Sequence, residues 1–270
     1  MKKSNKWLRS PIVTVVAFAV AIVLLLGAGI GTARAALTYF SEVYSTQIGM
    51  DNIGVSLLEN GEAVSYRNYD SSKANGTWIE ATGKLLDNMV EEGKNVELGK
   101  EYTEELSVRN TGIASGDKAA INEYVRVTIY KYWTDGENEG TGKERTLTPN
   151  LIKLKLDGVD LFDDSVTSYG NWIKDPSSTT KERVVLYYNQ LLNAGSTTDN
   201  FANEISIDKG VMKGATQKQE GKKFITSYAY DGMEFNLEVQ VDAVQEHNAQ
   251  DAILSAWGKN VTISGTSLSL

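Results

Sequence analysis

Apolar and polar residues alternate along many short segments of this chain, and this alternation predicts a mainly β protein. Residues two apart on a strand face the same side, so an apolar residue at every second position marks a strand with one buried face. The alternation is clearest over 124–133 and recurs over 151–156 and 235–241. The run 183–188 is apolar more continuously, which suits a central strand. Shorter strands are expected at Leu106 with Val108, and at Ile205 with Ile207.

Tight turns separate several of these segments. Asn-Gly and Asp-Gly pairs favour two-residue hairpin turns, because both positions accept positive φ. Three such pairs are expected to close hairpins: Asn60-Gly61, Asp157-Gly158 and Asp231-Gly232. Many short strands joined in this way predict an antiparallel, jelly-roll-like β-sandwich.

One short helix is expected near the C-terminus, over 248–257. Asn248 is the expected N-cap and Gly258 the expected residue after the last turn. The apolar stripe of this helix would pack on a sheet edge, and it consists of Ala249, Ala252, Ile253, Ala256 and Trp257. The polar segments 67–93 and 134–148 are expected to be long loop insertions.

The first 35 residues have the three parts of an export signal. Basic residues precede the apolar stretch 12–30, and the stretch is followed by Ala33-Arg34-Ala35. This pattern predicts cleavage before Ala36 by a signal peptidase, with one β-sandwich domain over 36–270. The apolar stretch is also long enough to span a bilayer, so an uncleaved anchor is the alternative. In both cases the body of the protein is expected outside the cell.

The charge and the absence of cysteine narrow the function classes. Residues 1–35 hold five of the 27 basic residues and none of the 35 acidic ones, so residues 36–270 carry a net charge of −13. Such a chain repels phosphate, so neither nucleic acid nor an anionic membrane surface is an expected partner. Membrane contact is expected only through the signal before cleavage. The sequence has no cysteine, which excludes disulfides and thiolate metal sites.

No catalytic constellation is recognisable, and no cofactor is expected. The single histidine, His247, cannot form a two-histidine zinc motif, and no G-x-S-x-G nucleophile motif occurs. We expect His247 to be a loop residue beside the helix. Asp157, Asp160, Asp163 and Asp164 are either a Ca²⁺ site or, as we expect, a solvated acidic turn.

Several aromatic residues have two interpretations. Trp133, Trp172, Tyr187 and Tyr188 could form a shelf on which sugar rings stack. At strand spacing, however, aromatic side chains more often pack in the core, and that is our expectation here.

The chain resembles a family of exported proteins of Gram-positive bacteria, the TasA/camelysin-like proteins that the dedicated signal peptidase SipW processes. The similar segments are spread along the sequence, and their order is more specific than any one of them. They are 29–36, the apolar start 37–40, ELSVRNTG at 105–112, YVRVTIYKYW at 124–133, ERVVLYY at 182–188, ISID at 205–208 and VDAVQ at 241–245.

The resemblance implies a secreted, non-enzymatic protein of the cell surface or biofilm matrix. It also implies fibre assembly by strand exchange, in which the segment freed by cleavage inserts into another copy or a related matrix protein. That segment is 36–49, with Leu37, Tyr39, Phe40 and Val43 as its apolar residues. The alternative is that this strand folds into its own domain. Two further hypotheses stay open: a camelysin-like secreted peptidase, which rests on the resemblance alone, and a module that binds glycans or surfaces.

Overall fold

The computed structural model describes residues 53–70, 77–87, 89–91, 94–112, 121–135, 142–213, 215–220 and 223–270. The chain divides into two compact units, 1–50 and 51–270. The predicted export signal, the cleavage residues Ala33, Ala35 and Ala36, and the predicted assembly residues Leu37, Tyr39, Phe40 and Val43 all lie outside the described residues.

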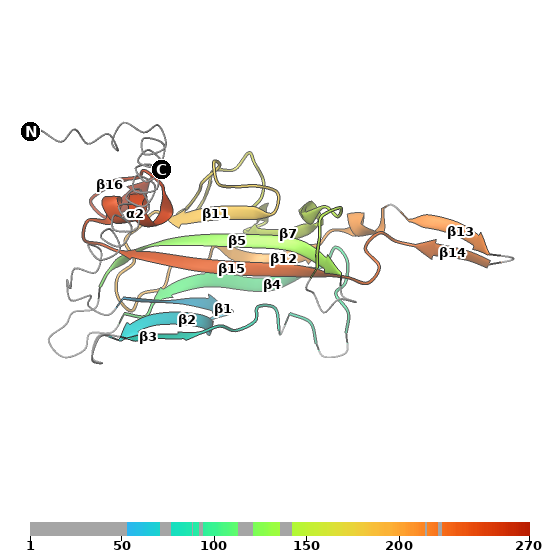
Figure 1. The fold of residues 1–270 in the computed structure, drawn as a ribbon, viewed down its shortest axis with the longest axis horizontal. Helices are drawn as coiled ribbons and strands as arrows, with labels where there is room; N and C mark the ends of the chain where they lie inside the picture. Colours follow the sequence, from blue (N-terminus) through green and yellow to red (C-terminus); the bar gives the residue numbers. More distant parts are fainter. Residues whose placement is uncertain are drawn as a thin grey trace, which may run out of the picture. The chain divides into compact units, whose positions relative to one another are not determined.

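The first layer of the second unit is a seven-stranded antiparallel sheet (Figure 1). Its strands in spatial order are β3 (Thr77–Ala81), β2 (Glu62–Asp70), β1 (Gly54–Glu59), β4 (Glu101–Asn110), β12 (Ala202–Ile207), β7 (Ile152–Leu156) and β8 (Val159–Asp160). Each neighbouring pair is antiparallel.

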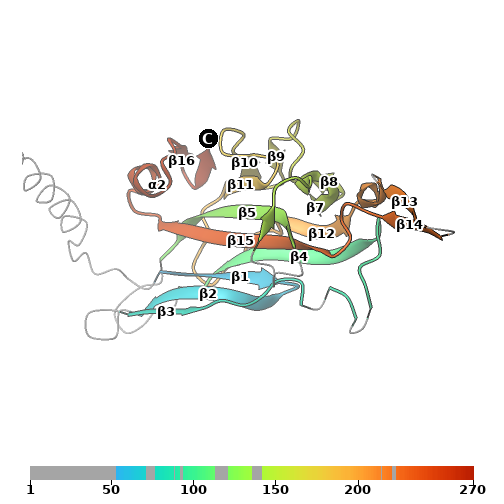
Figure 2. The ribbon, with the colours of Figure 1, turned by 45° about the vertical axis from the view of Figure 1, so that its right-hand side comes forward.

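The second layer is a six-stranded antiparallel sheet. Its order is β15 (Met233–Gln245), β5 (Glu123–Asp135), β11 (Arg183–Tyr188), β10 (Trp172–Lys174) and β9 (Ser168–Tyr169), with β6 (Lys143–Glu144) paired to one end of β5. The turned view shows β5 and β15 lying over β1 and β4 (Figure 2).

Smaller elements complete the unit. Two short hairpins form from β13 (Thr216–Glu220) with β14 (Lys223–Ser227), and from β16 (Thr262–Ser264) with β17 (Ser267–Ser269). The α-helix α2 covers Ala249–Trp257, and two 3₁₀ turns, η3 and η4, cover Pro149–Leu151 and Lys209–Met212. Within the described residues, no helix is both long and apolar enough to cross a membrane.

The core lies between the two sheets, as the alternation predicts. Leu106 and Val108 from β4 meet Val127 and Ile129 from β5, and all four are fully buried. A second apolar cluster lies under α2, where Ile253 packs with buried residues of β5 and β11. The predicted mainly β, antiparallel sandwich with one short helix near the C-terminus is therefore confirmed.

Most of the predicted elements are confirmed, including the strands β5, β7, β11 and β15. The turns Asn60-Gly61 and Asp157-Gly158 join β1 to β2 and β7 to β8, and all four residues have positive φ. The turn predicted at Asp231-Gly232 forms, with Gly232 at positive φ, but it does not close a hairpin. β14 pairs with β13 and β15 pairs with β5, so the strands on its two sides belong to different sheets.

Two further expectations need correction. Asn248 precedes the helix as predicted, but its backbone is left-handed and its side chain makes no capping hydrogen bond. Gly258 ends the helix in a left-handed conformation, as expected. The segment 67–93 is not all loop, because β2 runs to Asp70 and pairs with β3. Trp78 of β3 contacts Tyr69 and Arg67 of β2, and these contacts favour the pairing.

Candidate functional site

β15 leaves one long edge of the sandwich open. It pairs with β5 over its whole length of 13 residues. On its other side, no strand in the described part of the chain pairs with it. An edge strand presents a row of backbone N–H and C=O groups that can template a further strand. A further strand could therefore pair with this edge.

A groove runs along this edge, because the two sheets end at different places. β15 contacts β1, and the seven-stranded sheet continues past β1 with β2 and β3. The groove has a volume of about 840 Å³. Its wall is 235–239 of β15, its floor includes Leu57, Val64 and Ser65, and its far side is the segment 82–87.

The groove has a continuation at the C-terminal end of β15. A second hollow of about 400 Å³ is lined by Val241 and Ala243 of β15 and by Val55 of β1. Together the two hollows follow β15 over residues 235–243. Nine residues of extended chain span about 30 Å, so the groove is long enough for a complete strand.

The inward face of β15 is incompletely covered. Phe235, Leu237, Val239 and Val241 pack against the core, yet each remains partly exposed. Ile129, which faces the same core from the neighbouring strand β5, is fully buried. The difference arises because nothing in the described residues lies beyond β15 in its own sheet. An apolar strand placed there would bury these side chains, and burial of apolar surface drives association.

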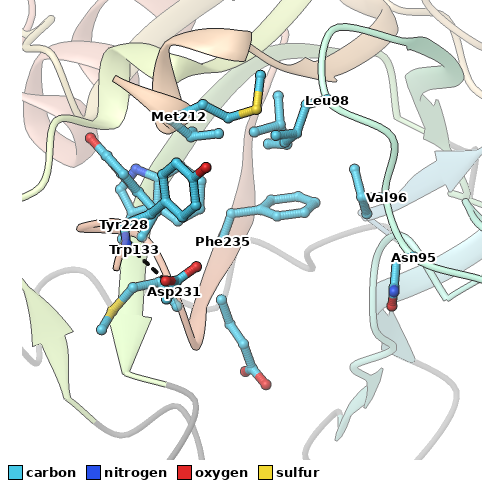
Figure 3. Close-up of a pocket in the computed structure, with 13 residues that line it drawn as sticks. Asn95, Val96, Leu98, Trp133, Met212, Tyr228, Asp231 and Phe235 are labelled. Carbon is cyan, nitrogen blue, oxygen red and sulfur yellow. Dashed lines mark hydrogen bonds between the residues drawn. The ribbon is translucent and has the colours of Figure 1, made fainter. Parts of the chain in front are cut away.

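An aromatic pocket of about 750 Å³ adjoins the groove and shares Asn95, Val96 and Phe235 with it (Figure 3). Trp133 forms its back wall and meets the ring of Tyr230 edge-on, with 4.9 Å between ring centroids. The indole N–H of Trp133 already has a partner, since Nε1 donates to the Thr148 carbonyl at 3.0 Å. The pocket is therefore preformed and suited to an apolar or aromatic side chain.

A carboxyl pair holds the segment 82–87, which we call the flap. The Leu86 backbone N–H donates to Glu59 Oε1 at 2.6 Å. The side chain of Glu59 in turn shares a hydrogen bond with the side chain of Glu104, a residue that is only 1% exposed. Burial raises the pKa of Glu104 to about 8, and the hydrogen bond and charge of Glu59 act in the same direction. Glu104 is therefore protonated at neutral pH and acts as the donor in this pair.

The buried position of Glu104 could have been predicted from the sequence. Glu104 has the same parity as Leu106 and Val108, so alternation places it on the core face of β4. A carboxyl group at a core position needs a partner or a proton. The partner could not be foreseen, because Glu59 comes from another strand.

The predicted catalytic and metal candidates do not form a site. His247 is exposed on the turn before α2. In the acidic turn, Asp160 accepts from Lys153 at 3.0 Å and Asp157 accepts from Asn203 at 2.7 Å. Among the residues that the structure describes, no three histidine, aspartate or glutamate side chains come together as a metal ion would require.

The four aromatic residues considered for a sugar-stacking shelf lie in the interior. Trp133, Trp172, Tyr187 and Tyr188 are each at most 8% exposed. A shelf built from them is therefore excluded, and the expectation of core packing is confirmed.

Comparisons with known proteins add no relative, since no family model, no curated protein and no solved structure matches this chain. The function is therefore argued from the groove, the aromatic pocket and the sequence.

Proposed function

We propose that this protein is an exported, non-enzymatic structural protein of the cell surface or extracellular matrix, and that its copies join by strand exchange. In this proposal cleavage after Ala35 frees residues 36–49, and this segment of one copy occupies the β15 groove of the next. The observation that carries the proposal is the unpaired edge of β15 beside a partly exposed apolar face.

The chemistry of the segment suits the groove. A strand added to a sheet edge gains affinity from backbone hydrogen bonds and specificity from alternate side chains in pockets. The 14 residues of 36–49 exceed the nine positions of the groove. They include the apolar residues Leu37, Tyr39, Phe40 and Val43. In the proposed complex these side chains cover the partly exposed inward face of β15.

The geometry of the exchange leads to filaments. The donor segment and the acceptor groove are different surfaces, so the contact is head-to-tail. A head-to-tail contact propagates unless the rotation between copies closes a ring. Each added copy brings a new empty groove, and assembly continues.

The other hypotheses receive no supporting observation. For the peptidase hypothesis, the described residues hold no group of three histidine, aspartate or glutamate side chains that could bind a metal ion, and His247 lies apart from the groove lining. The glycan hypothesis loses the aromatic shelf on which it rested.

The first test compares assembly of four forms of the chain. Protein beginning at Ala36 is expected to form filaments, seen by sedimentation and electron microscopy, and protein lacking 36–49 is expected to stay monomeric. Val239→Arg places a charge on the groove wall and is expected to block assembly. Ser255→Arg on the exposed side of α2, outside the lining of both hollows, is the control and is expected to assemble normally. A mature chain that stays monomeric at all concentrations and salt levels would contradict the proposal.

A second test separates exchange between copies from insertion of the segment into its own domain. Because the chain has no cysteine of its own, any disulfide that forms must join the two introduced cysteines. Leu37→Cys, Tyr39→Cys and Val43→Cys proteins are each mixed with Val239→Cys protein under mild oxidation. At least one mixture is expected to give a disulfide-linked dimer, since the bond requires Cα atoms about 4–7 Å apart. If dimers never form, while one chain carrying both cysteines cross-links internally, the segment folds into its own domain.

A further inference from the structure

Two contacts hold the flap at the far side of the groove. At Gly83 an added Cβ would lie 2.3 Å from the Val64 carbonyl oxygen, so the flap backbone packs directly on β2. Three residues later, the Leu86 N–H donates to Glu59 Oε1. Leu86 has a φ of 68°, a left-handed conformation that a leucine rarely adopts. The hydrogen bond to Glu59 therefore maintains a backbone that would otherwise relax.

The second carboxyl group lies behind the first. Glu104 points to the interior of the sandwich and shares its hydrogen bond with Glu59. Its other oxygen, Oε1, is buried and has no hydrogen-bond partner in the described structure. A fully ionised carboxylate in this place would be desolvated and would face a like charge.

Among the described residues, none of the causes of the Glu104 pKa shift is a basic side chain. Glu59 of β1 is the charged group that acts on Glu104. On β4, the strand of Glu104, Tyr102 lies two residues before Glu104 and therefore on the same side of the strand. The Tyr102 hydroxyl accepts a hydrogen bond from the Glu97 N–H. From the opposite sheet Lys131 faces the interior, but its ammonium donates to the Ile152 carbonyl at 2.7 Å and responds to Asp160 and Lys153.

The flap contributes two charged groups of its own, Lys84 and Asp87. Both are solvent-exposed, on the outer side of the flap rather than in the interior with Glu104. The arrangement therefore depends on the proton that Glu104 donates to Glu59.

We propose that Glu59 and Glu104 form a proton-operated latch on the acceptor groove. With the proton present, Glu104 donates to one oxygen of Glu59, the other oxygen accepts from the Leu86 N–H, and the flap stays in place as the far side of the groove. When the proton leaves for solvent, two adjacent carboxylates repel, Glu59 releases Leu86, and the flap opens. This inference rests on the proposed function of the groove, since the latch regulates access of the incoming strand.

The pH at which the latch opens follows from Glu104. Its pKa is raised to about 8 in the latched state, so the latch is strongest at acidic pH and weakens as the pH rises toward 8. Below that pKa, down to the ordinary range of a carboxyl group, each pH unit raises the ratio of open to latched flap about tenfold, and above it the ratio levels off. The groove therefore accepts a strand fastest under alkaline conditions.

Hydrogen–deuterium exchange of the full mature chain tests the latch directly. Amide protection of a peptide containing Leu86, corrected for intrinsic base catalysis, is followed from pH 6.5 to 9.5. In the wild type we expect protection to fall by up to tenfold per pH unit from pH 6.5 to about 8 and to level off at higher pH. A peptide from 125–129 of β5 reports global unfolding and is expected to stay protected throughout.

Two variants make the test specific. Glu104→Gln keeps a donor for Glu59 but cannot ionise, so its flap is expected to stay protected up to pH 9.5. Glu59→Ala removes the acceptor of the Leu86 N–H, and its flap is expected to be open at every pH. Any pH dependence that survives in Glu104→Gln comes from another group, such as Lys131, and equal pH dependence in wild type and Glu104→Gln overturns the latch.

Failure of the latch and failure of strand exchange give different results. Assembly rates are measured on the same proteins at pH 7 and pH 9. If strand exchange is wrong, filaments are absent while the flap still opens with pH. If only the latch is wrong, filaments form at equal rates in wild type and Glu104→Gln at both pH values. If both are right, only the wild type accelerates at pH 9.

Discussion

The Lys259 ammonium donates a hydrogen bond to the Asp175 carboxylate at 2.9 Å and joins the segment after α2 to the loop after β10. Asp175 is almost fully buried. Burial alone would raise the pKa of Asp175, but hydrogen bonds from Ser177, Lys259 and Ser178 outweigh it and bring the pKa to about 2. The pair therefore fastens the C-terminal segment, which covers the second core cluster, to the six-stranded sheet.

Loss of this contact is expected to destabilise the fold. Lys259→Met keeps the length of the side chain but leaves Asp175 with only its serine partners. We expect a loss of about 1–3 kcal/mol in the free energy of unfolding at pH 7, measured by urea denaturation. Because the pKa of Asp175 is depressed in the folded state, its contribution is present above pH 4 and is lost as the pH falls toward 2. The difference between variant and wild type should therefore shrink between pH 4 and pH 2, and a constant difference would contradict this account.

Glu123 is expected to make the fold less stable as the pH rises. Its carboxyl group is fully buried, neither oxygen has a hydrogen-bond partner in the described structure, and burial raises its pKa to about 9. The folded state keeps this proton while the unfolded state releases it above pH 5. Stability is therefore complete at low pH and falls by about 1.4 kcal/mol per pH unit between about pH 5 and 9. Urea denaturation of Glu123→Gln at pH 5, 7 and 8 should show a shallower slope by this amount; an unchanged slope would mean that Glu123 is hydrated.

Gly83 is expected to be essential for seating the flap. A methyl group there would meet the Val64 carbonyl, which belongs to the backbone of β2 and cannot turn aside. Gly83→Ala should therefore lift the flap and speed trypsin cleavage after the exposed Lys84 several-fold at pH 7. Gly142→Ala is the matched control, because nothing lies within 4 Å of the added methyl group and the backbone is not left-handed. Equal cleavage of the two variants would show that the flap is seated by other contacts.

If copies of residues 36–270 join by the proposed strand exchange, the acidity of this part of the chain predicts that salt promotes assembly. Copies with a net charge of −13 repel one another, while backbone hydrogen bonds and apolar burial attract at short range. Raising the NaCl concentration from about 10 mM to about 1 M shortens the Debye length from ~30 Å to ~3 Å. We expect filament growth, followed by light scattering, to accelerate at least tenfold. Slower growth at high salt would indicate that attraction between charges holds the copies together.

Trp172 offers a test of the core that does not involve assembly. Its ring packs against Tyr188 and Phe201, and its Nε1 donates to the Asp199 carbonyl at 3.1 Å. Trp172→Ala is expected to cost about 3–5 kcal/mol in the free energy of unfolding. The same substitution at Trp78, which is 43% exposed on an edge strand, is expected to cost about 1 kcal/mol or less. Chemical denaturation of both variants measures the difference.

Local patterns in the sequence identified most of the longer strands and the buried side of each. Alternation over 124–133 and 235–241 identified β5 and β15, because a period of two is a property of the extended backbone. Asn60-Gly61 and Asp157-Gly158 determined two turns, because positive φ at both positions is a local requirement. The helix end at Gly258 follows from the same local chemistry.

Which strands are neighbours, and which side chains meet between the sheets, depends on long-range packing that becomes visible only in the folded protein. A turn signal such as Asp231-Gly232 reverses the chain but does not choose the partner of the next strand, and β15 pairs with β5 instead. The groove exists because the two sheets end at different strands. The carboxyl pair exists because β1 and β4 bring Glu59 and Glu104 together. Alternation assigns a residue to a face, whereas pairing between distant segments depends on the packing of the whole core, which no local pattern encodes.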